Sequence, residues 1–177
     1  MEYKKKIGEE TLLLRSPEES DAEEMLNCLK TVCGETRFLL KDPDEITFTV
    51  DDEKNFINAV NSSKIGVMLV GFLNGEYVGH CSLSELGPKR FSHRVDLGIS
   101  LYQKFTGLGI GTFMIEKLIE IAKEKGLEQI TLEVSAENKR AVAIYKKFGF
   151  EIYGTFPKNM KYKDGTYSDV IWMMKEL

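Results

Sequence analysis

Three glycines alternate in Gln103-Lys-Phe-Thr-Gly-Leu-Gly-Ile-Gly-Thr112, a stretch that follows a strand-like run and precedes a helix-like one. Glycine leaves its backbone N–H group uncovered, and the first N–H groups of a helix have no partner within that helix. Together with the helix dipole, such donors favour an anion such as a pyrophosphate. The stretch therefore predicts a site for a phosphorylated ligand. The alternative is that the glycines only form a tight turn and let the helix pack closely on a sheet.

Two other phosphate-binding loops fit this stretch less well. A Walker loop would need a closing Gly-Lys-Ser/Thr, which is missing, and the dinucleotide fingerprint would need glycine where Thr112 stands. Glu133 lies at about the right separation for a ribose-binding acid, although it falls within its strand. A dinucleotide-binding oxidoreductase therefore stays as an alternative.

The elements around the loop predict a strand–helix–strand unit. Residues 92–102 indicate a strand, Ile110, Met114 and Leu118 recur on one face of a helix that Gly126 ends, and residues 130–135 indicate a second strand. A right-handed crossover makes the two strands parallel and places the helix N-terminus at their carboxyl edge. We expect a binding site at that edge.

The rest of the chain predicts further strands and helices. Asn74-Gly75 suits a two-residue hairpin turn, and Asp164-Gly165 a second turn. The predicted strands outside the central unit are 11–15, 67–73, 77–83, 150–156 and 168–174, and the predicted helices are 21–33 and one beginning at 51.

Composition limits the class of protein. The 177 residues are 42% hydrophobic and 29% charged, which predicts a single domain over 1–177. A net charge of −4 argues against nucleic acid as a partner. Three cysteines without CxxC spacing and two histidines form no recognisable zinc pattern, so we expect reduced cysteines and no metal. No apolar run is long enough to span a membrane, so we expect a cytoplasmic protein without a membrane partner.

A second motif follows the strand at 130–135. Asn138-Lys-Arg-Ala-Val-Ala-Ile-Tyr-Lys-Lys-Phe-Gly-Phe150, taken with the glycine loop, resembles the GNAT superfamily of N-acetyltransferases, which carry an R/Q-x-x-G-x-G/A loop, a strand and an N…A…Y…GF helix in that order. The resemblance extends from Thr11 to about Met174. One position departs from it, because Thr106 stands where the family has Arg or Gln. Since the loop acts through backbone N–H groups, this departure affects the signature more than the chemistry.

The resemblance implies an α/β fold with a mixed, mostly antiparallel seven-stranded sheet flanked by about four helices. It also implies transfer of an acetyl group from acetyl-CoA to a primary amine, with a small molecule or amino acid as the first-choice acceptor. A protein N-terminus or lysine side chain is the second choice of acceptor. A CoA-binding module without catalysis is the alternative from a different class, and a homodimer is a family-level expectation.

The same resemblance assigns the cofactor-binding residues. In such a fold the strand ending at Leu101 parts from the strand at 130–135, with Gly98 a plausible bulge, and pantetheine enters the gap. The expected cofactor-binding residues are Ile99, Leu101, Thr106, Gly107, Leu108, Gly109, Ile110, Gly111, Thr112, Asn138 and Tyr145. Asn138 is also a candidate helix N-cap.

Aminolysis of a thioester needs a base for the amine and an acid for the leaving sulfur. Tyr145 matches the family position for the acid, and a tyrosine packed in the core is its alternative. Asp96 is our candidate base, with an outward-facing strand carboxylate as its alternative and with Glu133 and His80 as the other candidates. By resemblance, Glu35, Phe38 and Tyr167 are candidate acceptor-binding residues, and ordinary loop packing is their alternative.

Overall fold

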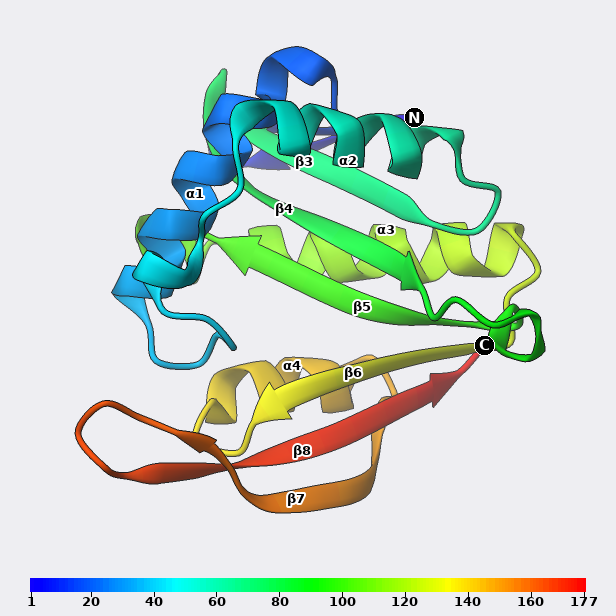
Figure 1. Ribbon diagram of the computed structural model, residues 1–177. Coiled ribbons are helices and arrows are strands. Elements are labelled where there is room, and N and C mark those ends of the chain that lie inside the picture. Colours follow the sequence, from blue (N-terminus) through cyan, green and yellow to red (C-terminus); the bar gives the residue numbers. More distant parts are fainter.

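One eight-stranded sheet forms the centre of the computed structural model, which describes residues 1–177 (Figure 1). The strand order is β1-β2-β3-β4-β5-β6-β8-β7, and every neighbouring pair is antiparallel except β5 and β6. The strands are β1 Glu2–Ile7, β2 Glu10–Arg15, β3 Val67–Leu73, β4 Glu76–Glu85, β5 Arg94–Leu101, β6 Gln129–Ser135, β7 Glu151–Lys161 and β8 Tyr167–Glu176. The predicted mixed, mostly antiparallel sheet is confirmed.

The predicted count of seven strands is wrong, because the first residues form an additional edge strand. In β1, Tyr3, Lys5 and Ile7 face inward and alternate with exposed residues. The alternation is masked in the sequence because Lys5 occupies an inward position, with its ammonium 4.9 Å from the centre of the Phe113 ring. Burying the aliphatic stem of a lysine while its charge lies over an aromatic face is favourable.

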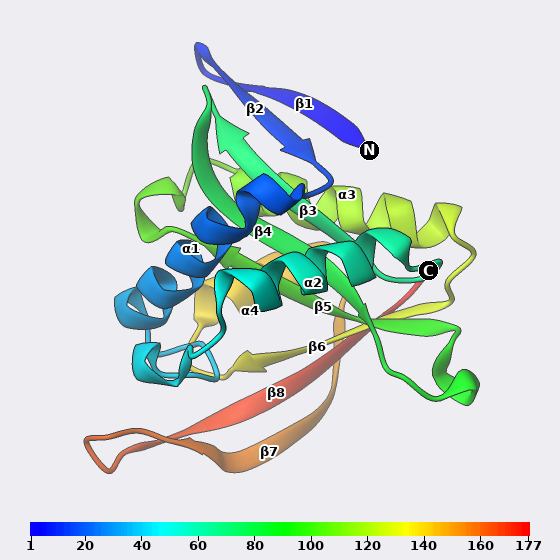
Figure 2. The same cartoon turned by 45° about the horizontal axis from the view of Figure 1, so that its top comes forward.

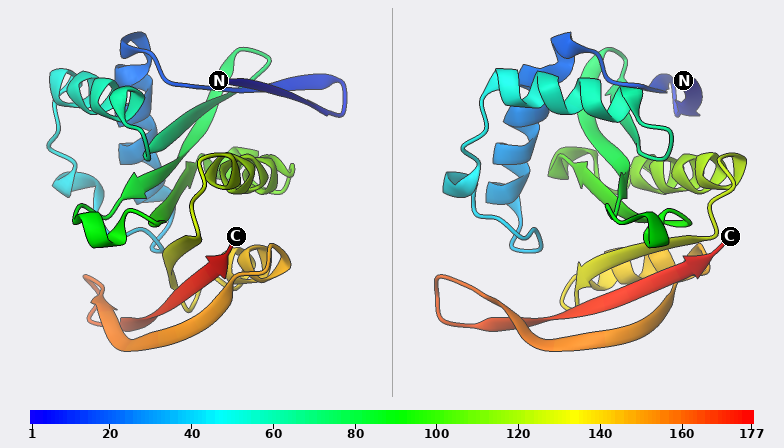
Figure 3. Two further views of the ribbon diagram at one scale, coloured as in Figure 1. Left: turned by 90° about the vertical axis from the view of Figure 1, so that its right-hand side faces the viewer. Right: turned by 45° about the vertical axis from the view of Figure 1, so that its right-hand side comes forward.

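Four helices cover the two faces of the sheet, as predicted (Figures 2 and 3). Helices α1 (Ala22–Glu35) and α2 (Val50–Ser62) lie on one face, and α3 (Ile110–Glu124) and α4 (Lys139–Lys147) lie on the other. Helix α2 begins at a capping box in which Thr49 accepts from the Asp52 N–H group at 3.1 Å. None of the four is long and apolar enough to cross a membrane.

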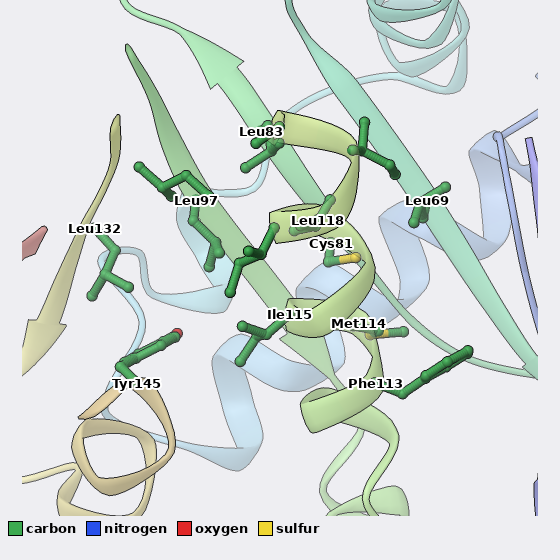
Figure 4. Packing of buried hydrophobic residues seen from close by; sticks show 14 of the residues in the cluster. Leu69, Cys81, Leu83, Leu97, Phe113, Met114, Ile115, Leu118, Leu132 and Tyr145 are labelled. Carbon is green, nitrogen blue, oxygen red and sulfur yellow. The ribbon is translucent and has the colours of Figure 1, made fainter. Parts of the chain in front are cut away.

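The main core lies between α3 and the middle strands (Figure 4). Met114 and Leu118 of α3 are fully buried against Leu69, Cys81 and Leu83 of the strands. A smaller core forms under α1 and α2 on the opposite face. The helix that follows the glycine loop is therefore fixed to the sheet by its whole apolar face.

The sheet divides between β5 and β6. These two strands pair only at Arg94–Gln129, Val95–Ile130 and Asp96–Thr131. Beyond Asp96, β5 stays paired with β4 as far as Leu101, and β6 stays paired with β8 as far as Ser135. The register of β4 and β5 is regular through Gly98, so the predicted bulge there is wrong. The gap opens because each strand follows its other neighbour.

Candidate active site

A cavity of about 210 Å³ lies where β5 and β6 diverge, between the glycine loop and α4. It includes every predicted cofactor-binding residue except Leu108 and Ile110. Its lining is Ile99, Leu101, Thr106, Gly107, Gly109, Gly111, Thr112, Ile115, Asn138, Arg140, Ala141, Ile144 and Tyr145. Residues from two sequence motifs and from the gap between strands thus meet in one site.

The glycine loop presents a run of free backbone donors. After the Thr106 N–H group, which donates to the Gln103 carbonyl at 3.0 Å, the next N–H group with an acceptor in the chain is that of Phe113, which donates to the Gly109 carbonyl at 3.1 Å. The N–H groups of residues 107–112 have no acceptor within the protein. Because they surround the positive end of a fifteen-residue helix, they suit a diphosphate.

The loop conformation requires glycine at two positions. Gly107 has φ of +92° and Gly109, the residue before α3, has φ of +81°. Side-chain-bearing residues rarely adopt such angles. Thr106 secures the turn that precedes them, because its hydroxyl donates to the Gln103 carbonyl at 2.8 Å.

Leu108 and Ile110 differ from the other predicted cofactor residues in where their side chains lie. The Leu108 side chain is exposed, and that of Ile110 is buried in the core. Neither side chain lines the cavity. What these two residues offer to the site is their backbone N–H groups.

The first turn of α4 adds polar groups on the other side of the cavity. The Asn138 side chain accepts from the Ala141 N–H group at 3.1 Å, so the N-cap interpretation is confirmed, and Asn138 also lines the cavity. Arg140 was not predicted, yet its guanidinium comes so close to Gly107 that a Cβ there would be 3.6 Å from Nη2. The cavity therefore has a cation and no acidic side chain in its lining. The sequence signal for Arg140 was its place two residues after Asn138.

Tyr145 is packed in the core and also lines the cavity. Its ring is 7% exposed and meets Phe150 edge-to-face at 5.7 Å. Figure 4 shows the hydroxyl pointing away from α4, in the region between Leu97 and Ile115. Burial raises the pKa of Tyr145 to about 12, and the negative charge of Asp96 adds to that effect. The phenol therefore keeps its proton at neutral pH.

Asp96 lies at the vertex where β5 and β6 separate. It belongs to the last pair between the two strands, and the Thr131 hydroxyl donates to its Oδ1 at 3.1 Å. Burial raises the pKa of Asp96, Glu133 raises it further, and the Thr131 hydrogen bond opposes the shift. A carboxylate with a raised pKa is a better base than an ordinary aspartate.

His80 has the features of a packed strand histidine. Its Nδ1 lies 2.9 Å from the Tyr77 hydroxyl, and burial lowers its pKa to about 4. The imidazole is therefore neutral at physiological pH, and its hydrogen-bonding partner lies within the protein rather than in the cavity.

The three predicted acceptor residues do not meet in one cavity. Glu35 accepts from the Gln103 N–H group at 2.9 Å and lines a second cavity of about 510 Å³, beside α1 and the β3–β4 turn. Phe38 is half-buried in the loop between α1 and α2. Tyr167, at the start of β8, is 46% exposed, and neither Phe38 nor Tyr167 lines these two cavities. Their part in acceptor binding stays a prediction.

Comparison with known proteins identifies this arrangement. Residues 33–150 match the model of the Acetyltransferase (GNAT) family. The chain belongs to the GNAT family. It is 32% identical to the L-amino acid N-acetyltransferase AaaT of Escherichia coli (strain K12) over 108 residues, which are 60% of this chain and 66% of that enzyme. The match thus spans just under two thirds of that relative's length.

Solved structures of GNAT proteins share the whole fold. A GNAT-family acetyltransferase from Streptococcus pneumoniae is 33% identical, with a TM-score of 0.90 over 94% of this chain and 99% of that one. The protein yncA from Salmonella typhimurium, solved with its cofactor acetyl-CoA, has a TM-score of 0.83 at 18% identity, and the match covers 94% of each chain. The second likeness is one of fold alone.

Proposed function

We propose that this GNAT protein transfers an acetyl group from acetyl-CoA to a primary amine. The observation that carries the proposal is the meeting of free N–H donors, Arg140 and the Tyr145 phenol in one cavity, with Asp96 at the vertex of the same gap. Membership of the family and the resemblance of the fold to an acetyl-CoA complex support the donor.

The residues around the cavity fit the two ends of acetyl-CoA. The N–H groups of residues 107–112 and the Arg140 guanidinium suit its phosphates. Beyond Asp96, every second backbone amide of β5 faces the gap instead of a neighbouring strand, so the strand offers hydrogen bonds to the pantetheine amides. Acetyl-CoA supplies an activated thioester carbonyl.

The protein's own groups then move two protons. Asp96 accepts a proton from the ammonium form of the acceptor, directly or through water, which leaves a neutral amine able to attack the carbonyl. A backbone N–H group of β5 that faces the gap beyond Asp96 stabilises the oxyanion. Tyr145 donates its phenolic proton to the departing sulfur, and its raised pKa means that the proton is present at neutral pH.

A small-molecule amine or amino acid is the first-choice acceptor. The name of the Escherichia coli relative, an L-amino acid N-acetyltransferase, supports this class. Acetylation of a protein N-terminus or lysine is the second choice. A cytoplasmic location, a homodimeric state and the absence of a nucleic-acid partner are further parts of the proposal.

Thermal unfolding with candidate ligands tests the donor. We expect acetyl-CoA and CoA to raise the melting temperature and NAD to leave it unchanged, because a ligand that binds only the native state stabilises it. Release of free thiol from acetyl-CoA in the presence of a panel of amines then tests transfer. Stabilisation by NAD alone would favour the oxidoreductase alternative, and CoA binding without amine-dependent thiol release would favour a binding module.

A further inference from the structure

The face of β6, β8 and β7 opposite α4 has no helix over it (Figures 1 and 3). This face continues directly from Asp96, because Thr131, the partner of Asp96 on β6, belongs to it. The next residue of β6 on the same face is Glu133, and its neighbour across the ladder on β8 is Trp172. This face therefore borders the base on the side away from the donor cavity. Thr131, Ser135 and Val170 on it are buried, whereas Glu133 is exposed.

Glu133 places an unpaired carboxylate on this face of β6. Its side chain is exposed and makes no hydrogen bond or ion pair within the chain. It lies close enough to Asp96 for its charge to act on that carboxyl group. Glu151 of β7 lies on the same face, because it pairs with Met174, which is also the partner of Thr131. Three carboxylates against Arg94, the cation that acts on Asp96, produce a negative potential that attracts a cation.

Trp172, itself partly buried, is the centre of an aromatic cluster whose other two residues are exposed. The Tyr153 ring stacks beside it, with centroids 6.2 Å and planes 28° apart, and the Phe156 ring meets it edge-on at 6.2 Å. Tyr153 is 56% exposed and Phe156 is 48% exposed, so the cluster is not part of the core. Gly154 allows this packing, because a Cβ there would be 2.9 Å from Trp172 Cε3.

We infer that Glu133 and Trp172 bind a second cationic group of the acceptor while its other amine reacts beside Asp96. A tryptophan face next to a carboxylate is a favourable site for an ammonium group. The inference rests on the proposed N-acetyltransferase function and names the acceptor class as short diamines and amines of similar charge spacing. One residue of β6, Leu132, separates Thr131 from Glu133, so Glu133 lies about 7 Å along the strand from the row of Asp96, which matches two amines joined by roughly four or five carbons.

Paired acceptors of equal length test this inference. We expect 1,4-diaminobutane and 1,5-diaminopentane to have kcat/KM at least roughly tenfold above butylamine and pentylamine. Glu133→Gln should lower the ratio of kcat/KM for the diamines to kcat/KM for the monoamines by a similar factor, because the effect of the Glu133 charge on Asp96 is common to both classes of amine. Glu116→Gln, which removes an exposed carboxylate of α3 on the other side of the sheet, is the matched control and should leave this ratio unchanged.

Binding can also be followed without turnover, because Trp172 is the only tryptophan of the chain. Titration with a diamine should change Trp172 fluorescence in the wild type and in Glu116→Gln but not in Glu133→Gln, whereas a monoamine should leave it unchanged. Equal kcat/KM for monoamines and diamines would overturn the inference and leave the proposed function intact. A fall in kcat of Glu133→Gln that is equal for monoamines and diamines would also overturn the inference. So would burial of the Trp172 face by a second copy of the chain, which would be detected as a molecular mass that rises with protein concentration. If no amine releases thiol, the proposed function fails instead.

Discussion

At the scale of single residues, Tyr145 combines a structural ring with a chemical hydroxyl. The ring is buried against Phe150, while the hydroxyl belongs to the cavity lining. Tyr145→Phe retains the ring and removes only the proton donor, so we expect kcat to fall roughly 10²–10⁴-fold, the range typical of a lost general acid. Single-turnover thiol release measures this. The melting temperature and its increase with acetyl-CoA should match the wild type; an unchanged kcat would show that another group protonates the sulfur.

The substitution Asp96→Asn should have opposite effects on activity and on stability. Since burial raises its pKa, the native state favours the protonated carboxyl. Stability is therefore greatest below the unfolded pKa of Asp96 and is lost as pH rises through the higher folded pKa. Asp96→Asn should melt above the wild type at pH 8, with the difference vanishing as pH falls to about 4, the ordinary aspartate range.

Activity gives the matching test of Asp96. A base works only when deprotonated, so kcat/KM of the wild type should decline on the acid side as Asp96 gains its proton. In Asp96→Asn, the part of this decline in kcat/KM that is caused by Asp96 should disappear, and only the part caused by protonation of the acceptor amine should remain. A variant with the wild-type profile would transfer the role to another group, with Glu133 the nearest candidate.

At the scale of elements, the first turn of α4 completes the phosphate site that the α3 loop begins. Arg140 faces Gly107 across the cavity, whereas its neighbour Lys139 is exposed and does not line it. Arg140→Gln should therefore weaken acetyl-CoA binding and leave kcat at saturation unchanged, with the affinity difference shrinking at high salt. Calorimetric titration measures it. Lys139→Gln has the same charge change and should bind acetyl-CoA like the wild type. An equal loss of acetyl-CoA affinity in both variants would indicate that only the overall positive charge of this region matters, and not a contact made by Arg140.

Elements that depend on short-range geometry could be predicted from the sequence. Asn74 and Gly75 have φ of 48° and 88°, the left-handed pair that a two-residue hairpin turn requires. The helix after the glycine loop could be predicted because its apolar face repeats regularly and glycines alternate with other residues at its start. The cofactor side of the site followed from these local signals together with the family motif.

Features that depend on contacts between distant segments could not be predicted in the same way. Strand β1 has an inward Lys5 that is accommodated only by the Phe113 ring of α3. The parting of β5 and β6 needs no bulge at Gly98, because β4 and β8 each hold their own partner in register. The roles proposed for Arg140 and Glu133 follow from the positions of α4 and β8 beside the gap, which the sequence alone does not give.

At the scale of the whole molecule, the two halves of the divided sheet are joined again at the protein surface. Arg37, in the loop after α1, places its guanidinium 3.7 Å from the centre of the Tyr162 ring and donates to the Thr166 hydroxyl at 2.8 Å. Both partners belong to the β7–β8 connection. Lys163 reaches back from the same connection to Asp42 and Asp44, each at 3.2 Å.

The contacts of Arg37 with the β7–β8 connection should affect binding of the acceptor amine and not binding of acetyl-CoA. Arg37→Ala removes the contacts with Tyr162 and Thr166 and leaves the Lys163 ion pairs, so we expect a higher KM for the acceptor. Acetyl-CoA affinity should stay unchanged, because the contact of Arg37 near the donor cavity is an exposed ion pair with Glu137 at 3.5 Å, which contributes little. Hydrogen exchange should become faster in both joined segments. Lys163→Ala removes only exposed ion pairs, which contribute little, and should produce a smaller change. A loss of acetyl-CoA affinity in Arg37→Ala would mean that the link supports the whole gap rather than its acceptor side.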